Sequence, residues 1–145
     1  MGETQVTAHE RNWPVSCIRL RAAAARVKGD IVRIGTGHTD GVNVDISLAD
    51  DTNVYRVAVA MEDAASGATY MAAYMGTVKC TVPSATYTAG DGLKVHNGAV
   101  ADTATAATAF DNLSTNACFG CIAVGGTTVT EITATLYGDQ HTATT

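Results

Sequence analysis

Cys118 and Cys121 are the residues of this sequence whose spacing best matches known chemistry, because two cysteines separated by two residues form redox centres and halves of zinc sites. A redox pair of this kind places its first cysteine at a helix N-terminus, where the thiolate is stabilised, whereas the surrounding residues favour a β-strand. Zinc needs two further ligands, and Cys17 and Cys80 do not form a second close pair. We therefore expect both cysteines to be small, buried core side chains.

The other residues able to do chemistry are dispersed along the chain. No histidine lies beside a serine or cysteine in a nucleophile motif, and no two form a close ligand pair; they are His9, His38, His96 and His141. The acidic residues match no calcium-loop spacing, and no glycine-rich loop leads into a helix that would bind phosphate. The sequence therefore predicts no catalytic residue, no metal and no cofactor, and we do not expect an enzyme.

The charge of this chain is distributed unevenly. The net charge is −5, but residues 11–28 contain five basic residues and no acidic one: Arg11, Arg19, Arg21, Arg26 and Lys28. Residues 34–145 contain three basic residues against eleven carboxylates. A basic arm on an acidic body is typical of a segment that contacts a negatively charged partner. The alternative is a soluble tail that has no partner.

The aromatic content of the arm bears on the kind of partner. Segments that bind nucleic acid carry exposed aromatic side chains among their basic residues for stacking on bases, and here only Trp13 is available. We therefore expect a protein partner and no nucleic acid. Trp13 presents a large apolar ring, and Pro14 favours an extended backbone before it. Trp13 is thus expected to be a buried anchor, either on the body of its own chain or on a partner.

The body of the chain is predicted to consist of short strands joined by turns. Residues 42–48 alternate between apolar and polar, which predicts that the apolar positions are buried and that Asn43, Asp45 and Ser47 face solvent. Residues 54–61 are nearly all apolar and are expected to be buried on both faces. Further strands are predicted at residues 31–34, 69–75, 77–82, 93–96, 99–101, 117–124 and 128–137.

The pattern within three of these segments predicts further local detail. In residues 77–82, the pattern places Val78, Cys80 and Val82 inward. In the last strand, Val129 is out of step with the apolar positions that follow, which predicts a bulge near Thr130 or Glu131. Residues 17–28 contain a run of four alanines, and both a short helix and an extended crossing fit this segment.

The length of 145 residues fits one domain with an appendage. We predict an extended basic arm over residues 1–26, a β domain over residues 27–138 and a flexible tail over residues 139–145. The fold class is expected to be mostly β, as a small β-sandwich or a β-tulip-like barrel. No apolar stretch approaches the ~20 residues that a spanning helix needs, and no secretory signal is evident. A protein made in the cytoplasm, with no membrane partner, is expected.

Five short segments follow one another in an order that resembles the capsid decoration, or cement, proteins of tailed bacteriophages. The resemblance covers roughly residues 27 to 138, and the segments are Lys-Gly-Asp-Ile-Val (28–32), Val-Ala-Val-Ala-Met-Glu-Asp-Ala-Ala-Ser-Gly (57–67), Ala-Tyr-Met-Gly-Thr-Val (73–78), Thr-Ala-Gly-Asp-Gly-Leu-Lys-Val (88–95) and Phe-Gly-Cys-Ile-Ala-Val (119–124). It implies a structural virion protein on the outer surface of a mature phage head, where trimers bridge neighbouring major capsid subunits.

Within that resemblance, the basic arm would be the docking device. The residues expected to contact the capsid are Arg11, Trp13, Arg19, Arg21 and Arg26. The arginines would pair with capsid carboxylates, and the tryptophan would fill an apolar slot. A receptor-binding or fibre-associated β module is the alternative, because it would share the threonine-rich β composition while binding a glycan or a cell surface.

Overall fold

The computed structural model describes residues 15–48, 56–96, 99–102 and 117–142. Within these ranges the chain forms one nine-stranded mixed sheet. The strands are β1 (Val15–Arg21), β2 (Ile31–Thr39), β3 (Val42–Ile46), β4 (Val57–Ala60), β5 (Thr69–Tyr87), β6 (Gly92–His96), β7 (Ala99–Asp102), β8 (Ala117–Val124) and β9 (Gly126–Thr142). The prediction of a mostly β protein is confirmed.

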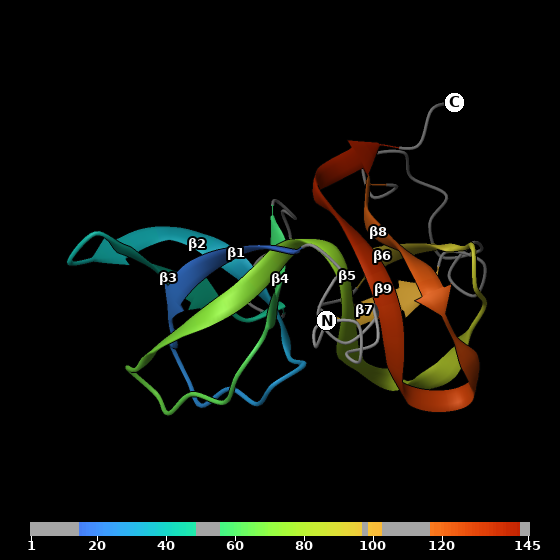
Figure 1. Cartoon of the computed structure of the whole chain (residues 1–145), viewed down its shortest axis with the longest axis horizontal. Coiled ribbons are helices and arrows are strands. Elements are labelled where there is room, and N and C mark those ends of the chain that lie inside the picture. Colours follow the sequence, from blue (N-terminus) through green and yellow to red (C-terminus); the bar gives the residue numbers. More distant parts are fainter. Residues whose placement is uncertain (1–14, 49–55, 97–98, 103–116, 143–145) are drawn as a thin grey trace, which may run out of the picture.

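Five of the strands close into a small ring. The strand order begins β1-β3-β2-β4-β5, and β1 also pairs with β5. The order then continues β5-β9-β8-β6-β7, which forms a second lobe. Figure 1 shows the ring on the left and the second lobe on the right, with β5 passing from one into the other. This ring is therefore the part of the fold that matches the predicted barrel.

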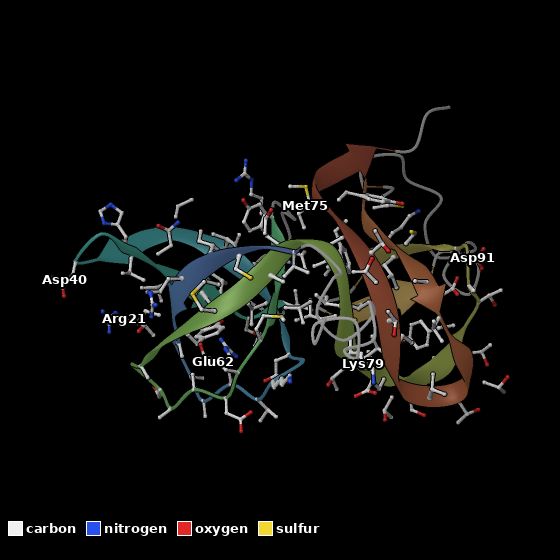
Figure 2. The ribbon with its side chains drawn as sticks, viewed as in Figure 1. Arg21, Asp40, Glu62, Met75, Lys79 and Asp91 are labelled. Carbon is white, nitrogen blue, oxygen red and sulfur yellow. The ribbon has the colours of Figure 1, made fainter. Side chains whose placement is uncertain are left out.

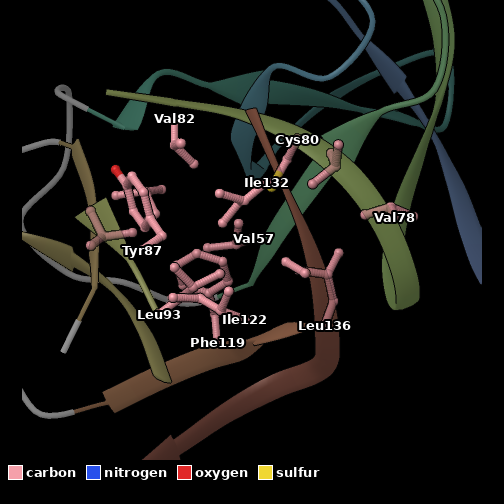
Figure 3. Packing of buried hydrophobic residues seen from close by; sticks show 14 of the residues in the cluster. Val57, Val78, Cys80, Val82, Tyr87, Leu93, Phe119, Ile122, Ile132 and Leu136 are labelled. Atoms are coloured by element: carbon pink, nitrogen blue, oxygen red, sulfur yellow. The ribbon is translucent and has the colours of Figure 1, made fainter. Parts of the chain in front are cut away.

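β4 separates two hydrophobic cores. Its alternating side chains point to opposite faces, as in any strand. Ala58 and Ala60 pack inside the ring with Leu20, whereas Val57 and Val59 belong to the larger cluster that fills the second lobe. Figure 3 shows this larger cluster around β4, β5, β8 and β9. The prediction that residues 54–61 are buried on both faces is confirmed for Val57–Ala60, whereas Arg56 is exposed, Met61 is half-buried and residues 54–55 lie outside the described residues.

β5 is a single strand of 19 residues where the sequence predicted two. Its first part pairs with β1 and β4, and its second part pairs with β9. Gly76 lies between the parts at a φ of 110°, which glycine adopts without steric cost, so the strand changes partners without ending. The predicted inward direction of Val78, Cys80 and Val82 is confirmed, since all three are buried.

The predicted faces of β3 are wrong. Asp45 is 2% exposed, while its apolar neighbours Val44 and Ile46 are only partly buried. Alternation correctly separates the two faces of this strand, but it cannot say which face meets the core. Here the buried side is the one on which Arg26 and Tyr70 supply hydrogen-bond donors to the carboxylate.

Both ends of the described chain differ from the predicted domain boundaries. Residues 15–21 of the predicted arm form β1 and belong to the sheet, and residues 22–30 form an irregular connection that bends at residues 23–24 and turns at residues 28–29. This connection is held because the N–H groups of Ala22 and Arg26 donate to the carbonyls of Ala68 and Ala64, both at 2.8 Å. β9 continues to Thr142 and thus takes in part of the predicted tail. Residues 1–14 and 143–145 lie outside the described residues.

The remaining strand predictions largely hold. β6 and β7 form an antiparallel pair, as do β8 and β9, and all four lie on segments that were predicted to be strands. The β5–β9 ladder is irregular opposite Glu131 and Val129, where the sequence predicted a bulge. The extra residues lie on β5 and include Pro83, which has no N–H to donate to a ladder. β7 ends at Asp102, and residues 103–116 lie outside the described residues.

A close backbone contact at Gly125 gives a test of this packing. A Cβ atom at this position would lie 1.9 Å from the carbonyl oxygen of Tyr87, whereas one at Gly37 would meet nothing within 4 Å. We expect Gly125→Ala to lower the free energy of unfolding by about 2 kcal/mol, because the β8–β9 turn must move away from β5. Gly37→Ala is the matched control and should change it little. Urea denaturation measures both, and equal effects would contradict the contact.

Candidate functional site

Three of the five predicted contact residues lie among the described residues. Arg19 and Arg21 are on β1, and Arg26 follows in the irregular segment that leads to β2. Arg11 and Trp13 lie outside the described residues. Arg19 and Arg21 are two positions apart on a strand, so both side chains project from the same face. β1 therefore brings two guanidinium groups together on the outside of the ring.

The two arginines of β1 are tied to the start of β5. Nη1 of Arg19 donates to the hydroxyl oxygen of Thr69 at 3.3 Å, and Nη1 of Arg21 donates to the carbonyl oxygen of Gly67 at 2.7 Å. Arg19 is exposed and Arg21 is half-buried. A guanidinium has five N–H donors, so one such bond holds its direction and leaves it able to meet a carboxylate. Figure 2 shows Arg21 at the ring, far from Lys79 on the second lobe.

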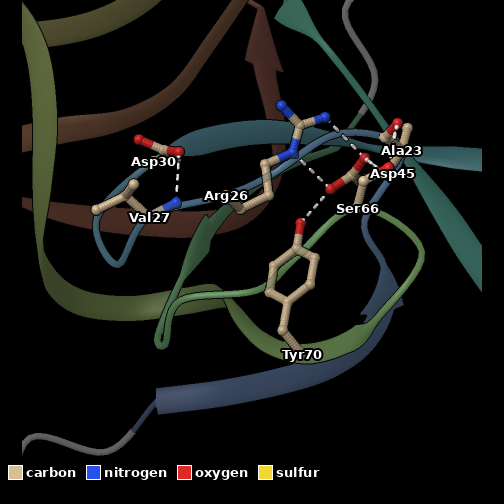
Figure 4. A network of polar contacts seen from close by, with 7 residues as sticks. All are labelled: Ala23, Arg26, Val27, Asp30, Asp45, Ser66 and Tyr70. Atoms are coloured by element: carbon tan, nitrogen blue, oxygen red, sulfur yellow. Dashed lines mark hydrogen bonds and ion pairs between the residues drawn. The ribbon is translucent and has the colours of Figure 1, made fainter.

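Arg26 has a different role, because its charge is used inside the protein. Nε donates to Oδ2 of Asp45 at 2.9 Å, and Nη2 donates to Oδ1 at 2.8 Å, which makes a bidentate ion pair. The backbone N–H of Ala23 donates to Oδ1 at 2.9 Å, and the hydroxyl of Tyr70 donates to Oδ2. Figure 4 shows the side chains of Arg26 and Tyr70 and the backbone of Ala23 around the carboxylate of Asp45. The charge of Arg26 is therefore used inside the ring and does not belong to the outer face of β1.

The electrostatics of this network favour the ionised carboxylate. Burial alone would raise the pKa of Asp45, but the hydrogen bonds from Arg26, Tyr70 and Ala23 outweigh it and hold that pKa below its usual value. The same contact with Asp45 raises the pKa of Arg26. Burial and the adjacent carboxylate raise the pKa of Tyr70, which stays protonated and acts as a donor. The network is thus a fixed structural charge and takes no part in proton transfer near neutral pH.

Sequence reasoning missed this network. Alternation with apolar residues predicts that Asp45 faces solvent, and the sequence does not distinguish Arg26 from the other basic residues of its segment. The three partners are 19 to 44 residues apart, and no local motif joins them. One feature of the sequence points to the network. Arg26 lies between four alanines and an apolar strand, and an arginine that becomes buried in such surroundings needs a carboxylate partner.

The cysteines lie in strands, as their context predicted. Cys118 and Cys121 are both half-buried on β8, and Cys80 is buried on β5. Burial raises the pKa of Cys118, and burial with a nearby carboxylate raises the pKa of Cys80 to about 12. Burial and a hydrogen bond with Cys121 raise the pKa of Tyr137. The raised pKa values of Cys80 and Cys118 describe thiols that are poor nucleophiles at neutral pH.

The described ranges contain no group of three or more histidine, cysteine or acidic residues placed to hold a metal ion. They also contain no helix with the length and apolar character needed to cross a bilayer. Of the predicted isolated histidines, His38 lies exposed on β2, and His96 and His141 lie in β6 and β9. His9 lies outside the described residues.

Asp91 and Asp102 form a pair of carboxyl groups beside the turn before β6. Asp102 is buried, and its Oδ2 accepts the backbone N–H of Thr88 at 2.8 Å. Partial burial, the charge of Asp102 and a hydrogen bond between the two carboxyl groups raise the pKa of Asp91. Two carboxyl groups that share a proton can act in acid catalysis. Here Asp102 is bound to the backbone of the turn, so the pair has a structural role in organising it.

The comparisons with known proteins concern the fold. No protein-family model matches this sequence, and no curated protein matches it. Among solved structures, the chain is similar to the N base of the head fiber gp8.5 of bacteriophage phi29, with a TM-score of 0.52 and 13% sequence identity. The match covers 90% of this chain and 100% of the phage chain. The two proteins therefore share a fold over nearly the whole of this chain.

Removal of the Asp45 charge should destabilise the ring. Asp45→Asn leaves the guanidinium of Arg26, whose side chain is 13% exposed, without its counter-charge. We expect a loss of about 3 kcal/mol in the free energy of unfolding, within the range for breaking a buried ion pair. Asp40→Asn, at the exposed tip of the β2–β3 hairpin, is the matched control and should change stability little.

The loss of stability caused by Asp45→Asn should depend on pH, because the pKa of Asp45 is lowered in the folded protein. The folded state holds the ionised form more tightly than the unfolded state does, so the stabilisation is present above the ordinary carboxyl pKa. It is lost as the pH falls through the lowered folded-state pKa. The gap between the native protein and Asp45→Asn should therefore be full at pH 7 and close only in strong acid. Urea denaturation across pH measures it, and a constant gap would contradict this assignment.

Asp91→Asn should have the opposite effect on stability. The raised pKa of Asp91 means that the folded state prefers the protonated form and loses stability as the pH rises through that value. An asparagine keeps a donor toward Asp102 without a proton to lose. We expect a higher melting temperature for the variant at pH 7 and no difference below the ordinary carboxyl pKa. A variant that melts lower at pH 7 would show that the pair is not repulsive.

Proposed function

We propose that this protein is a structural component of a phage virion that binds the outer surface of the head and stabilises it. In this proposal its partner is the major capsid protein, and trimers of the chain bridge neighbouring capsid subunits. The single observation that supports it most is the fold shared with the base of a phage head fiber over 90% of this chain. The order of sequence segments that resembles capsid decoration proteins points to the same place on a virion.

The described part of the proposed contact surface is the outer face of β1. Arg19 is exposed there, and Arg21 lies beside it on the same face. Both are directed by their bonds to Thr69 and Gly67, so they meet a partner with little loss of side-chain freedom. Arg11 and Trp13 precede this strand and complete the proposed surface. Arg26 is excluded, because its guanidinium is bound to Asp45.

Stabilisation by such a protein needs no chemistry. A ligand that binds the assembled lattice and not its separated subunits adds its free energy of binding to the lattice. At a free concentration one hundredfold above Kd, this linkage contributes about 2.7 kcal/mol per site.

A second role is favoured by the similar structure, which is the base of a head fiber. In that case the chain would attach to the head and also carry a further structure outward. The two roles share the head contact and differ in what the other face of the protein binds. Titration of decorated heads with candidate fibre proteins of the same virion would separate them, since a cement protein binds none.

The proposal is tested by co-sedimentation of the purified protein with expanded, undecorated heads from its own source over a series of salt concentrations. We expect saturable binding that weakens as salt rises, because ion pairs at an exposed surface are screened. Arg19→Glu should weaken it by about tenfold, equal to 1.4 kcal/mol. Lys79→Glu makes the same charge change at an exposed site on the second lobe and serves as the control.

The outcomes of this experiment are distinct. Saturable binding that ignores salt would keep the head contact and assign it to apolar groups. Absence of binding at every salt concentration would overturn the proposal. A truncation of the arm should stop before Val15, because removal of residues 1–26 would also remove β1 and open the ring. The truncated chain that lacks residues 1–12 is the informative variant, and full affinity in that chain would remove Arg11 from the surface.

A further inference from the structure

The outer face of β3 carries apolar side chains that do not belong to the cores. Asp45 points into the ring, where the hydroxyl of Tyr70 donates to it, so Val42, Val44 and Ile46 point outward. All three are half-buried, and none of them belongs to, or packs against, either hydrophobic cluster of the described residues. β3 therefore places a stripe of β-branched side chains on the outside of the ring. We call Val42, Val44 and Ile46 the β3 stripe.

The β3 stripe is bordered on one side by β2. A Cβ atom at Gly35 would lie 2.2 Å from the carbonyl oxygen of Val44 and 3.0 Å from Cγ1 of Ile46. The two strands are thus too close at this point for β2 to carry a side chain beside the stripe. Arg33 pairs with Ile46 and is only 3% exposed, so the sheet is covered at that end. Within the described part of the chain, the accessible end of the stripe is therefore Val42 and Val44.

On its other side the β3 stripe is bordered by β1. Arg21 pairs with Val44 in the parallel ladder between β1 and β3, and Arg19 projects from the same face as Arg21. The two guanidinium groups are bonded to Gly67 and Thr69, on the side of β5, so they lean away from β3. Neighbouring strands lie about 4.8 Å apart. The apolar stripe and the guanidinium groups are therefore about 10 Å apart, with β1 between them.

The patch formed by the β3 stripe, Arg19 and Arg21 lies far from the second lobe. Figure 2 shows Arg21 and Asp40, the latter at the tip of the β2–β3 hairpin, at the end of the ring that points away from the second lobe. A broad partner such as a capsid surface can approach this end without meeting the second lobe, which then projects outward.

The patch has two parts, and each part selects a different group on the partner. The arginines favour carboxylates, and the stripe favours an apolar side chain. Contact of this face with itself across a two-fold axis would bring the arginines of both copies together, and like charges in such positions are destabilising. Nucleic acid would satisfy the arginines and leave the stripe in water. The patch therefore favours a protein segment that presents carboxylates and an apolar side chain about 10 Å apart.

We propose that the β3 stripe is the apolar half of the head contact. It receives an apolar side chain from an acidic segment of the major capsid protein, and carboxylates of the same segment pair with Arg19 and Arg21. This inference rests on the proposed function and adds to it the chemistry of the capsid segment. It also gives a role to the reversed faces of β3, which bury the charge of Asp45 and leave apolar side chains outside.

The inference is tested with the full chain and expanded, undecorated heads, by measurement of Kd over a series of salt concentrations. Val44→Thr keeps a β-branched side chain, so it preserves the strand while it makes the stripe more polar. We expect binding to weaken by about fivefold at every salt concentration, because salt does not screen an apolar contact. Arg19→Glu should instead reduce the salt dependence itself, because it removes an ion pair.

Val124→Thr is the matched control, because it makes the same change at a 58% exposed position of β8. It should leave Kd unchanged. Urea denaturation and sedimentation velocity of the free proteins accompany the binding series. We expect Val44→Thr to match the native protein in both measurements, because the stripe packs on neither core and, in this proposal, on no second copy.

Four results would overturn the inference. Equal Kd values for Val44→Thr and the native protein, together with weaker binding of Arg19→Glu, would do so and leave the proposed function standing. Absence of head binding by the native protein at every salt concentration would overturn both. A clearly lower urea midpoint for Val44→Thr than for Val124→Thr would mean that the stripe is packed against its own chain. Association of the native protein that Val44→Thr abolishes would assign the stripe to a second copy.

Discussion

The carboxylate of Asp45 is the interaction on which the ring depends. It accepts two hydrogen bonds from Arg26, one from the hydroxyl of Tyr70 and one from the backbone of Ala23. These donors come from β5 and from the segment that joins β1 to β2, so one side chain of β3 holds together parts of the chain that the ladders alone connect loosely. β1 and β3 share only two residue pairs. A buried ion pair is costly to desolvate, and the completeness of its hydrogen bonds is what makes this one sustainable.

Around this charge, the chain builds two cores with a shared wall. β4 presents alanines to the ring and valines to the second lobe, and the small side chains inside the ring leave space for the phenol of Tyr70. β5 then leaves the ring at Gly76 and supplies the inner strand of the second lobe. Neither lobe can form its core without a strand that also belongs to the other. We infer that the two lobes fold as one cooperative unit.

The sequence predicted the strands well and their environment less well. Alternating or continuous apolar segments identified most strands, because strand periodicity is a local property. The buried side of β3, the unbroken course of β5 and the sheet pairing of residues 15–21 depend on partners distant in the chain, and no local pattern encodes them. Among the predicted contact residues, Arg19 and Arg26 look alike in sequence. Only the distant carboxylate of Asp45 distinguishes a surface charge from an internal one.

The 19-residue length of β5 has a mechanical consequence. β1 and β9 are both antiparallel to β5 and pair with its two ends, with an overlap at Met75 and Gly76. A force that pulls the two lobes apart along β5 therefore loads the ladder bonds in shear, and those bonds must yield together. Antiparallel ladder bonds run perpendicular to the strands, so none can open first like a zipper under this load. The continuous covalent backbone of β5 therefore transmits tension from one lobe to the other.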